Sequence, residues 1–311
     1  MEKQKKVIVI AGPTASGKTG CAVELAKGIG GEIVSADSMQ IYKYMDIGSA
    51  KPTPEERAQA VHYLVDEIDP FRSFSVAEYR RLAGQYIDRI LQSGKIPIVA
   101  GGTGLYINSI VSDMDFSVTP PDWERRKELY HLAEEKGGGA LHALLEELDP
   151  EAAQRIHPNN IKRMVRAVEA AEKGEKVLSF DHAAPGTGEY ECMMFGLTRE
   201  RQVLYSRIDR RVDDMIGQGL VQEVRSLMDR GLRADHVSMR GIGYKEIIAY
   251  LEGQYDLEEA IRLVKRNTRR YAKRQMTWFR RYKEMIWYDL TGDSLKAVSD
   301  MMERAAAFTG H

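Results

Sequence analysis

The chain has 311 residues, 43% of them hydrophobic and 29% charged, and its net charge is −1. This composition is typical of a soluble globular protein and excludes a disordered or fibrous chain, while the length predicts two domains. The longest apolar runs are far too short to span a membrane, and no signal-peptide core follows the charged opening, so we expect a cytoplasmic protein. Nothing in the sequence demands a dimer, and we expect a monomer. Cys21 and Cys192 are the only cysteines and predict neither a disulfide framework nor a zinc site.

The first third of the chain alternates short apolar runs with segments of helical periodicity. Lys6–Ala11 is a β-branched run that predicts a buried strand, and Thr19–Lys27 has the apolar spacing of a helix. A second helix is expected at Ser75–Ser93, where Ser75 and Glu78 form a capping pattern. Further strands are predicted at Glu32–Ala36, Tyr63–Ile68, Lys95–Ala100 and Glu191–Thr198. Short buried strands separated by helices predict an α/β fold with a mainly parallel, doubly wound sheet.

Between about residues 119 and 188 the pattern changes to helices without strands. Asp122 is placed to cap a helix at Trp123–Lys136, Asp149 and Pro150 open another, and Asn160–Lys173 ends at a glycine. We therefore predict an all-helical domain at 119–188, inserted into a core formed by 1–118 and 189–311. The same patterns predict a return linker and two long helices, at Asp181–Glu189, Arg201–Gly231 and Leu257–Lys283.

One segment between the first strand and the first helix fits the phosphate-binding pattern G-x-x-x-x-G-K-[ST] without a mismatch. Glycines let such a loop wrap closely around phosphate, and the N-terminus of the following helix adds positive potential. Lys18 would supply a point charge to phosphate oxygens, and the Thr19 hydroxyl would bind Mg²⁺. The alternative, a glycine-rich turn without chemistry, fits this context poorly. The candidate phosphate-binding residues are Gly12, Pro13, Thr14, Ala15, Ser16, Gly17, Lys18 and Thr19.

Polar residues follow two of the predicted strands, and in parallel sheets the ligand crevice lies beyond the carboxyl ends of the strands. Asp37 follows the second strand, where it can accept a proton or hold a metal-bound water, and Thr103 follows the fourth, where its hydroxyl can orient a substrate. From the pattern alone, Asp37 serves equally well as the cap of a turn, and Thr103 as part of a plain turn before a helix. The fourth strand lacks the terminal Asp of a Walker B magnesium site, which argues against an ATP-hydrolysing machine.

The segment 262–283 carries ten Lys and Arg residues without one acidic residue. A cluster of this density predicts an anionic partner, here nucleic acid or phosphate, in preference to a solvated basic face. In the insertion, Arg163 and Arg166 share a helix face, and ion pairs with Glu169 or Glu172 are the alternative to RNA contact. One basic helix face would carry Arg262, Arg266, Arg269, Arg270 and Lys273, extended by Arg207 and Arg211 of the preceding helix.

Several motifs in this order closely resemble the bacterial tRNA dimethylallyltransferases, which form the IPP transferase family. They are the loop Gly12–Thr19 and the segments Asp37–Tyr42, Met45–Pro52, Gly101–Tyr106, Gly241–Glu246 and Thr268–Trp278. The resemblance covers nearly the whole chain, and it implies a P-loop kinase-like core with an inserted helical domain that grips the anticodon stem-loop of tRNA. It also implies transfer of a dimethylallyl group from dimethylallyl diphosphate to N6 of the adenine 3′-adjacent to the anticodon, giving N6-isopentenyladenosine and diphosphate.

The resemblance gives the candidate residues roles in this chemistry. The P-loop would hold the diphosphate, with Lys18 and a Mg²⁺ ion on Thr19 neutralising the charge of the leaving group. Asp37 would take the proton from the weakly nucleophilic amine, and Thr103 would hydrogen-bond near it. The target adenine would have to leave its stack to reach them. The expected tRNA contacts are Asp37, Ser38, Met39, Gln40, Thr103, Arg126 or its neighbour Arg125, Arg163, Arg269 and Lys273.

Two other functions are compatible with the same features. A P-loop small-molecule kinase would bind ATP in the same loop and a hydroxylated acceptor near Asp37. An RNA-binding switch gated by a nucleotide would use the basic helix and catalyse nothing. Labelled dimethylallyl diphosphate and labelled ATP separate these possibilities.

Overall fold

The computed structural model describes residues 5–112, 122–175, 188–292 and 294–310. The chain divides into two compact units, Met1–Asp113 with Pro185–His311, and Met114–Ala184. The second unit is therefore inserted into the first, near the positions 119 and 188 expected from the sequence. Most of the predicted return linker, 181–187, lies outside the described residues.

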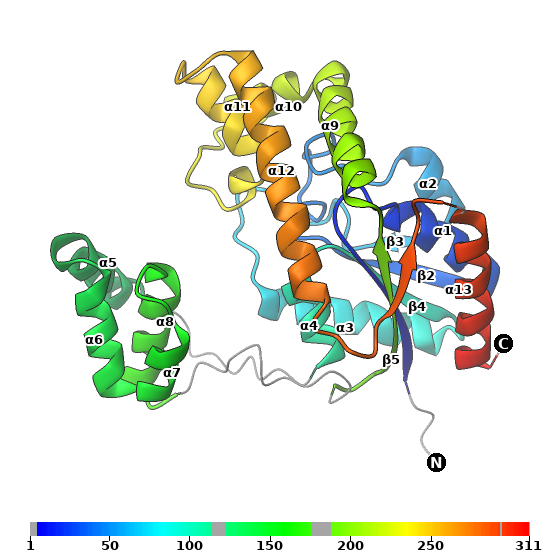
Figure 1. The fold of residues 1–311 in the computed structure, drawn as a ribbon, viewed down its shortest axis with the longest axis horizontal. Coiled ribbons are helices and arrows are strands. Elements are labelled where there is room, and N and C mark those ends of the chain that lie inside the picture. The colour runs from blue at the N-terminus through cyan, green and yellow to red at the C-terminus, as the bar shows by residue number, and fades with distance from the viewer. Residues whose placement is uncertain (1–4, 113–121, 176–187, 293, 311) are drawn as a thin grey trace. The chain divides into compact units, whose positions relative to one another are not determined.

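The larger unit is built on a parallel sheet with the strand order β3-β2-β4-β1-β5-β6 (Figure 1). This order confirms the doubly wound sheet, because β1 lies in the middle with later strands on both sides. In the register of the central strands, Ala11 and Ala36 both lie beside Gly101, so β1, β2 and β4 end at the same level. The strands are β1 (Lys6–Ala11), β2 (Gly31–Ala36), β3 (His62–Tyr63), β4 (Ile96–Gly101), β5 (Glu191–Thr198) and β6 (Ile286–Asp289).

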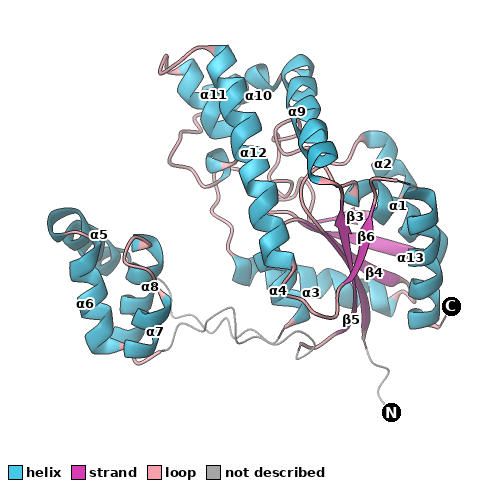
Figure 2. Cartoon of the chain, in the orientation of Figure 1, coloured by secondary structure: helices cyan, strands magenta, loops and turns pink. Residues whose placement is uncertain are grey.

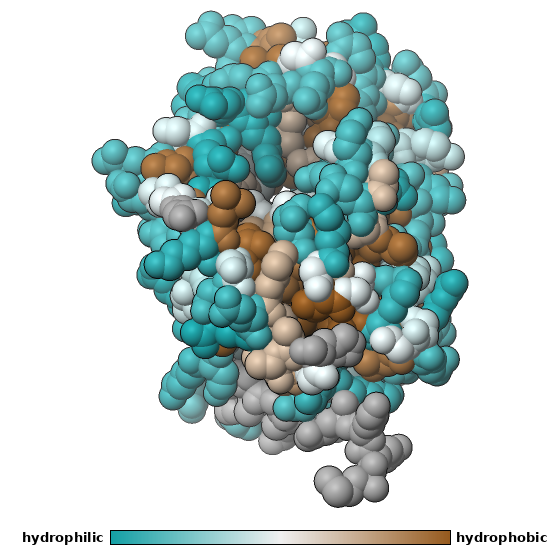
Figure 3. Space-filling model, turned by 90° about the vertical axis from the view of Figure 1, so that its right-hand side faces the viewer, coloured by the Kyte–Doolittle hydropathy of each residue, from teal (hydrophilic) through white to brown (hydrophobic). Residues whose placement is uncertain are grey.

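Helices cover both faces of this sheet, so its central strand is buried on both sides. Ile8 and Ile10 of β1 pack in one apolar cluster with helices α1 and α13, while Val7 and Val9 belong to a larger cluster on the other face. Each face thus takes every second side chain, as the pleat requires. Figure 3 shows the side of the molecule near α13, where hydrophilic residues cover most of the surface and apolar ones emerge between them. The helices of this face are α1 (Lys18–Ile29) and α13 (Ser294–Thr309).

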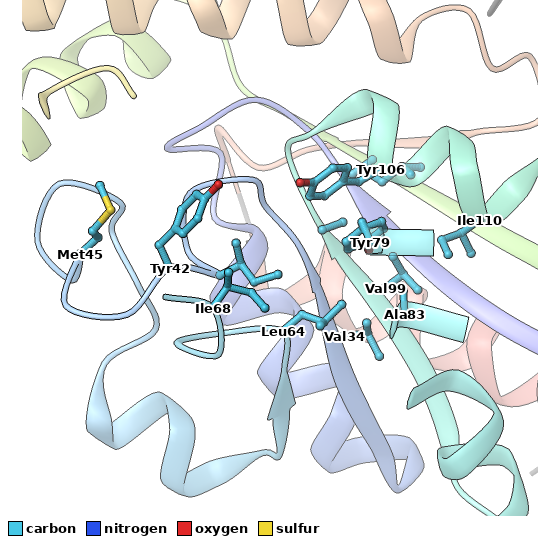
Figure 4. Close-up of a cluster of buried hydrophobic side chains, with 14 of the residues drawn as sticks. Val34, Tyr42, Met45, Leu64, Ile68, Tyr79, Ala83, Val99, Tyr106 and Ile110 are labelled. Atoms are coloured by element: carbon cyan, nitrogen blue, oxygen red, sulfur yellow. The ribbon is translucent and has the colours of Figure 1, made fainter. Parts of the chain in front are cut away.

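The larger apolar cluster joins the sheet to the helices of the other face. It includes Val34 and Val99 from the strands and Tyr79 and Ile110 from helices (Figure 4). The rings of Tyr79 and Tyr106 stack with centroids 3.9 Å apart. Elements contributing to this cluster or flanking it are α3 (Val76–Gln92), α4 (Gly104–Val111), α9 (Arg201–Gln218), α10 (Leu220–Asp229), α11 (Tyr244–Leu251) and α12 (Leu257–Phe279).

The inserted unit consists of helices only, among the residues that the structure describes (Figure 2). Asp122 caps the first helix by accepting a hydrogen bond from the Arg125 amide at 3.0 Å, and Asp149 caps the third through the Ala152 amide at 2.9 Å. Gly137, with φ of 79°, separates the first two helices. The unit has its own apolar core around Leu141, Leu145, Met164 and Val168. The helices are α5 (Trp123–Lys136), α6 (Gly138–Leu148), α7 (Pro150–Arg155) and α8 (Ile161–Glu172).

Three predicted elements are wrong in their extent. The third strand was expected at Tyr63–Ile68, but β3 ends at Tyr63 because Leu64 and Asp66 have φ of 59° and 63° and turn the chain away from the sheet. The single helix expected at Arg201–Gly231 is broken by Gly219, whose φ is 104°. The helix expected at Leu257–Lys283 ends at Phe279. The sequence analysis did not predict β6, α11, α13 or the short helix α2 (Pro54–Gln59).

Candidate active site at the carboxyl edge of the sheet

The loop between β1 and α1 has the wrapped backbone of a phosphate-binding loop. Ala15 and Gly17 both have left-handed backbones, with φ of 63° and 109°. Gly12 is a glycine for a packing reason, since a Cβ atom there would lie 2.5 Å from the Leu197 carbonyl oxygen of β5. Gly17 is the N-cap of α1 and provides no side-chain cap, so the first amides of the helix stay available to an anion.

Lys18 lines a cavity of about 960 Å³, together with other residues of this loop. Its Nζ donates a hydrogen bond to the Pro13 carbonyl at 2.7 Å. Burial lowers the pKa of Lys18 to about 8; the Asp37 carboxylate acts against this shift, and the Arg211 guanidinium adds to it. Among the described residues no carboxylate pairs with the Lys18 ammonium group, and a desolvated cation of this kind gains from a bound anion.

Two arginines of α9 bring further positive charge to the same cavity. Arg207 and Arg211 both line it, and Arg207 Nε donates to the Ala15 carbonyl at 3.0 Å. Burial lowers the pKa of Arg211, and the neighbouring Arg207 adds to this effect. Among the described residues Arg211 forms no ion pair within 4.0 Å. The sequence analysis placed these two arginines on an RNA surface; the structure puts them beside the P-loop.

Asp37 and Thr103 come together at the ends of neighbouring strands. Asp37 Oδ1 accepts hydrogen bonds from the Met39 amide at 2.9 Å and the Gln40 amide at 3.4 Å, so it does cap the following turn. Its other oxygen, Oδ2, accepts none from the described residues, and Asp37 lines the cavity that holds Lys18. Thr103 Oγ1 accepts a hydrogen bond from the Ser38 amide at 3.0 Å, which fixes the two strand ends to each other.

Two residues of the apolar cluster in Figure 4 also line the cavity. The phenol rings of Tyr42 and Tyr106 both line the cavity, and their hydroxyl groups point toward one another in that view. Gln40 is held by its own segment, because its Nε2 donates to the Ala50 carbonyl at 2.9 Å. Met39 packs against Gly241, where a Cβ atom would lie 2.5 Å from the methionine methyl group. An apolar floor with polar groups at one end suits a flat, partly apolar guest.

The sequence analysis assigned no role to two residues that organise this site. Gln275 of α12 accepts a hydrogen bond from the Thr14 amide at 2.9 Å and donates one to the Gly102 carbonyl at 2.8 Å. Glu223 of α10 accepts hydrogen bonds from three successive amides of the loop after Asp37, at 2.8, 2.7 and 3.0 Å. Two glycines were the available signal in the sequence. Gly102 packs against Gln275, and Gly48 packs against Tyr244, which donates a hydrogen bond to Glu223.

The basic helix is partly neutralised by carboxylates from elsewhere, so the expectation of an uncompensated stripe is wrong for part of it. Arg269 pairs with Asp209 at 2.5 Å, and Lys265 with Asp213 at 2.6 Å. Both aspartates belong to α9, which packs beside α12 (Figure 1). Lys273 is exposed and forms no ion pair among the described residues. Of the two predicted contacts on this helix, only Lys273 thus presents an unneutralised charge.

In the inserted unit the acidic residues pair with the two candidate arginines of α5. Arg126 donates to Glu169 at 2.9 and 2.7 Å, and Arg125 donates to Glu172 at 3.0 Å. Glu169 and Glu172 were the alternative partners considered for Arg163 and Arg166. In the structure Glu172 pairs with Arg125 and Glu169 with Arg126, and Arg163 lies in the first turn of α8. The Arg126 guanidinium also lies over the ring of Trp123, whose side chain is 70% exposed.

A family model described as IPP transferase matches residues 40–282 of this chain. The chain belongs to the IPP transferase family. A tRNA dimethylallyltransferase of Alkaliphilus oremlandii is 50% identical over 310 residues, which cover 99% of this chain and 98% of the relative. One of Acetivibrio thermocellus is 52% identical over 283 residues, 90% of each chain.

Solved structures agree with this membership of the IPP transferase family. A tRNA isopentenylpyrophosphate transferase of Bacillus halodurans matches with a TM-score of 0.75 and 44% identity, covering 98% of this chain and 97% of that one. A eukaryotic dimethylallyltransferase acting on tRNA matches with a TM-score of 0.80 and 28% identity, covering 98% of this chain and 78% of that one. The resemblance and the α/β fold predicted from the sequence are thus confirmed. Within the described ranges, no helix is long and apolar enough to cross a membrane.

Proposed function

We propose that this chain transfers a dimethylallyl group from dimethylallyl diphosphate to N6 of the adenine 3′-adjacent to the anticodon of tRNA. The observation that carries the proposal is that one cavity is lined both by the P-loop cation Lys18 and by the carboxylate of Asp37. A diphosphate on the loop and an amine beside Asp37 would therefore meet in the same space. Membership of a family whose relatives are tRNA dimethylallyltransferases supports this reading.

The residues of the cavity suit both halves of this reaction. N6 forms a bond to the allylic carbon while the carbon–oxygen bond breaks, and the electron pair of that bond leaves with the diphosphate. Lys18 and Arg211 would stabilise the negative charge that grows on the leaving group. The proton lost from N6 would pass to Oδ2 of Asp37, whose other oxygen is held in place by two backbone amides.

The Thr19 side chain fits a magnesium site shared with the diphosphate. Thr19 lies in the first turn of α1 and lines the cavity, and its hydroxyl has no hydrogen-bond partner among the described residues. A hydroxyl oxygen next to phosphate oxygens is the type of ligand set that Mg²⁺ prefers. When bound there, Mg²⁺ would add positive charge beside the leaving group.

For the tRNA, the proposal assigns the exposed cation of Lys273 to the phosphate backbone and Ser38, Met39 and Gln40 to the target base. Gln40 and Met39 line the cavity next to Asp37, which supports their placement beside the base. The aromatic surface of Trp123 in the inserted unit would add a stacking platform for RNA. A monomeric state and a cytoplasmic location stay predictions from the sequence.

The test is a transfer assay with unmodified tRNA, Mg²⁺ and either labelled dimethylallyl diphosphate or labelled ATP. We expect label in tRNA from the prenyl donor only. Label transferred from ATP to a small acceptor would establish a kinase instead, and RNA binding without any transfer would establish a switch.

Asp37→Ala should lower turnover by about two to four orders of magnitude while tRNA affinity is mostly kept. Asp235→Ala is the matched control, since Asp235 carries an exposed carboxylate outside the cavity. Equal rates for the two variants would remove Asp37 from the role of base.

A further inference from the structure

The two halves of the P-loop differ in the backbone donors that they offer to an anion. In the first half, Pro13 has no N–H group, the Thr14 amide donates to Gln275, and the Ser16 amide donates to the Pro13 carbonyl at 3.3 Å. A P-loop binds phosphate oxygens mainly through such amides. The Thr14 and Ser16 amides are thus engaged, while the Ala15 amide has no partner among the described residues, so this half offers an anion fewer free donors than the helix end.

The second half remains open. Arg199 Nε donates to the Ser16 carbonyl at 3.0 Å, and because N–H and C=O point in opposite directions across a trans peptide, the Gly17 amide points away from Arg199. The amides of Lys18 and Thr19 begin α1, which has no side-chain cap. Free donors thus gather at the helix end of the loop.

The amide group of Gln275 is fixed by contacts on both of its polar atoms. Its Oε1 accepts from Thr14 at 2.9 Å, its Nε2 donates to the Gly102 carbonyl at 2.8 Å, and the side chain is only 5% exposed. A Cβ atom at Gly102 would lie 2.3 Å from the Gln275 Nε2 atom, so any larger residue there would displace the glutamine amide. Gln275 therefore fills the space between the ends of β1 and β4, where the crevice of a doubly wound sheet lies.

We propose that Gln275 restricts the P-loop to diphosphates by holding the Thr14 amide that a third phosphoryl group would need. The inference rests on the proposed function and adds the residue that separates a prenyl diphosphate from ATP. Two phosphoryl groups find donors at the helix end of the loop, together with the Lys18 ammonium group. A third group extending over the first half meets the Gln275 side chain and no free amide at Thr14.

The test compares binding of inorganic pyrophosphate and inorganic tripolyphosphate, each with excess Mg²⁺, by isothermal titration calorimetry. The ratio of the two affinities is compared between variants, because the higher charge of tripolyphosphate raises its affinity in all of them. Gln275→Ala should shift this ratio toward tripolyphosphate by about tenfold, the size of one regained hydrogen bond to a charged group. Thr277→Ala, an exposed change on the same helix, should leave it unchanged.

A ratio in Gln275→Ala equal to that of the unmodified protein, with pyrophosphate still bound, overturns the inference and leaves the proposed function standing. If thermal melting shows that the alanine variant does not fold, Gln275→Asn takes its place. Its amide is one methylene group shorter and cannot span from Thr14 to Gly102, so the same shift is expected. Failure of the unmodified protein to bind pyrophosphate would overturn the proposed function and this inference together.

Discussion

Glu223→Gln tests whether one carboxylate holds the loop that follows Asp37. Oε2 of Glu223 accepts from the Asp46 and Ile47 amides, at 2.8 and 2.7 Å, and Oε1 accepts from the Gly48 amide at 3.0 Å and the Tyr244 hydroxyl at 2.8 Å. All four partners are donors, so a glutamine must turn its NH₂ group toward two of them. The hydroxyl of Tyr244 can rotate and accept, but a backbone amide cannot.

The expected loss of stability follows from the hydrogen bonds that the substitution removes or weakens. In the better orientation the glutamine loses the bond to Gly48 and keeps those to Asp46 and Ile47 as neutral bonds. A hydrogen bond to a charged group contributes about 1.5–3 kcal/mol and a neutral one about 1 kcal/mol. Glu223 is only half-buried, so the lower end of that range applies and the summed loss is about 3 kcal/mol. For a unit of this size, that corresponds to a fall in melting temperature of roughly 6–12 °C.

Thermal unfolding followed by circular dichroism measures this change, with steady-state kinetics on tRNA as the functional readout. The loop also supplies the Ser49 and Ala50 carbonyls that hold Gln40, so we expect a raised KM for tRNA with a smaller effect on kcat. Tyr244→Phe removes one bond to the same carboxylate and should cost about 1.5 kcal/mol. A melting temperature for Glu223→Gln equal to that of the unmodified protein would refute the reasoning.

Three further predictions concern the cations and the packing of the site. Because burial holds the pKa of Lys18 at about 8 and bound diphosphate favours the ammonium form, pyrophosphate affinity should fall by up to about tenfold per pH unit above pH 8, measured by calorimetry. A flat pH profile would contradict this. Lys273→Ala should reduce the slope of log affinity for tRNA against log salt concentration by about one, whereas Arg269→Ala should change it less because an aspartate of α9 already neutralises that guanidinium. Equal slopes for both variants would argue against the assignment. Gly48→Ala places a methyl group 2.6 Å from the Tyr244 ring, which is fully buried, and should destabilise the protein by about 1–3 kcal/mol in chemical denaturation. An unchanged free energy of unfolding would contradict this packing argument.

The central strands could be predicted closely because each is a run of residues buried on both faces. Such a run carries its signal in its own composition, as Lys6–Ala11 does, and the predicted and observed bounds of β1 coincide. The edge strands carry no such signal. β3 has two residues and β6 has four, too short for a periodicity, and both depend on pairing with a neighbouring strand that is distant in sequence.

The residues of the candidate site also fall into those that a local pattern predicts and those that depend on distant contacts. Asp37 and Thr103 could be predicted because the rule that ligands bind beyond the ends of parallel strands needs only the strand positions. Gln275 reaches Thr14 across 261 positions of sequence, and the glycine against which it packs, Gly102, does not indicate which residue is its partner. The counter-charges of the basic helix were missed for the same reason, since Asp209 and Asp213 belong to another helix.

The phosphate loop of this chain is therefore not a self-sufficient motif. Its own residues supply the wrapped backbone, the Lys18 ammonium group and the open end of α1. Side chains outside the loop fix its backbone by hydrogen bonds. Arg199 and Arg207 donate to two of its carbonyls, and Gln275 accepts from one of its amides. In the proposed function, the local motif would bind phosphate, and residues that follow the inserted unit in sequence would select the phosphate compound. A P-loop sequence is thus compatible with a prenyl diphosphate as well as with a nucleotide, because side chains from outside the motif contact its backbone.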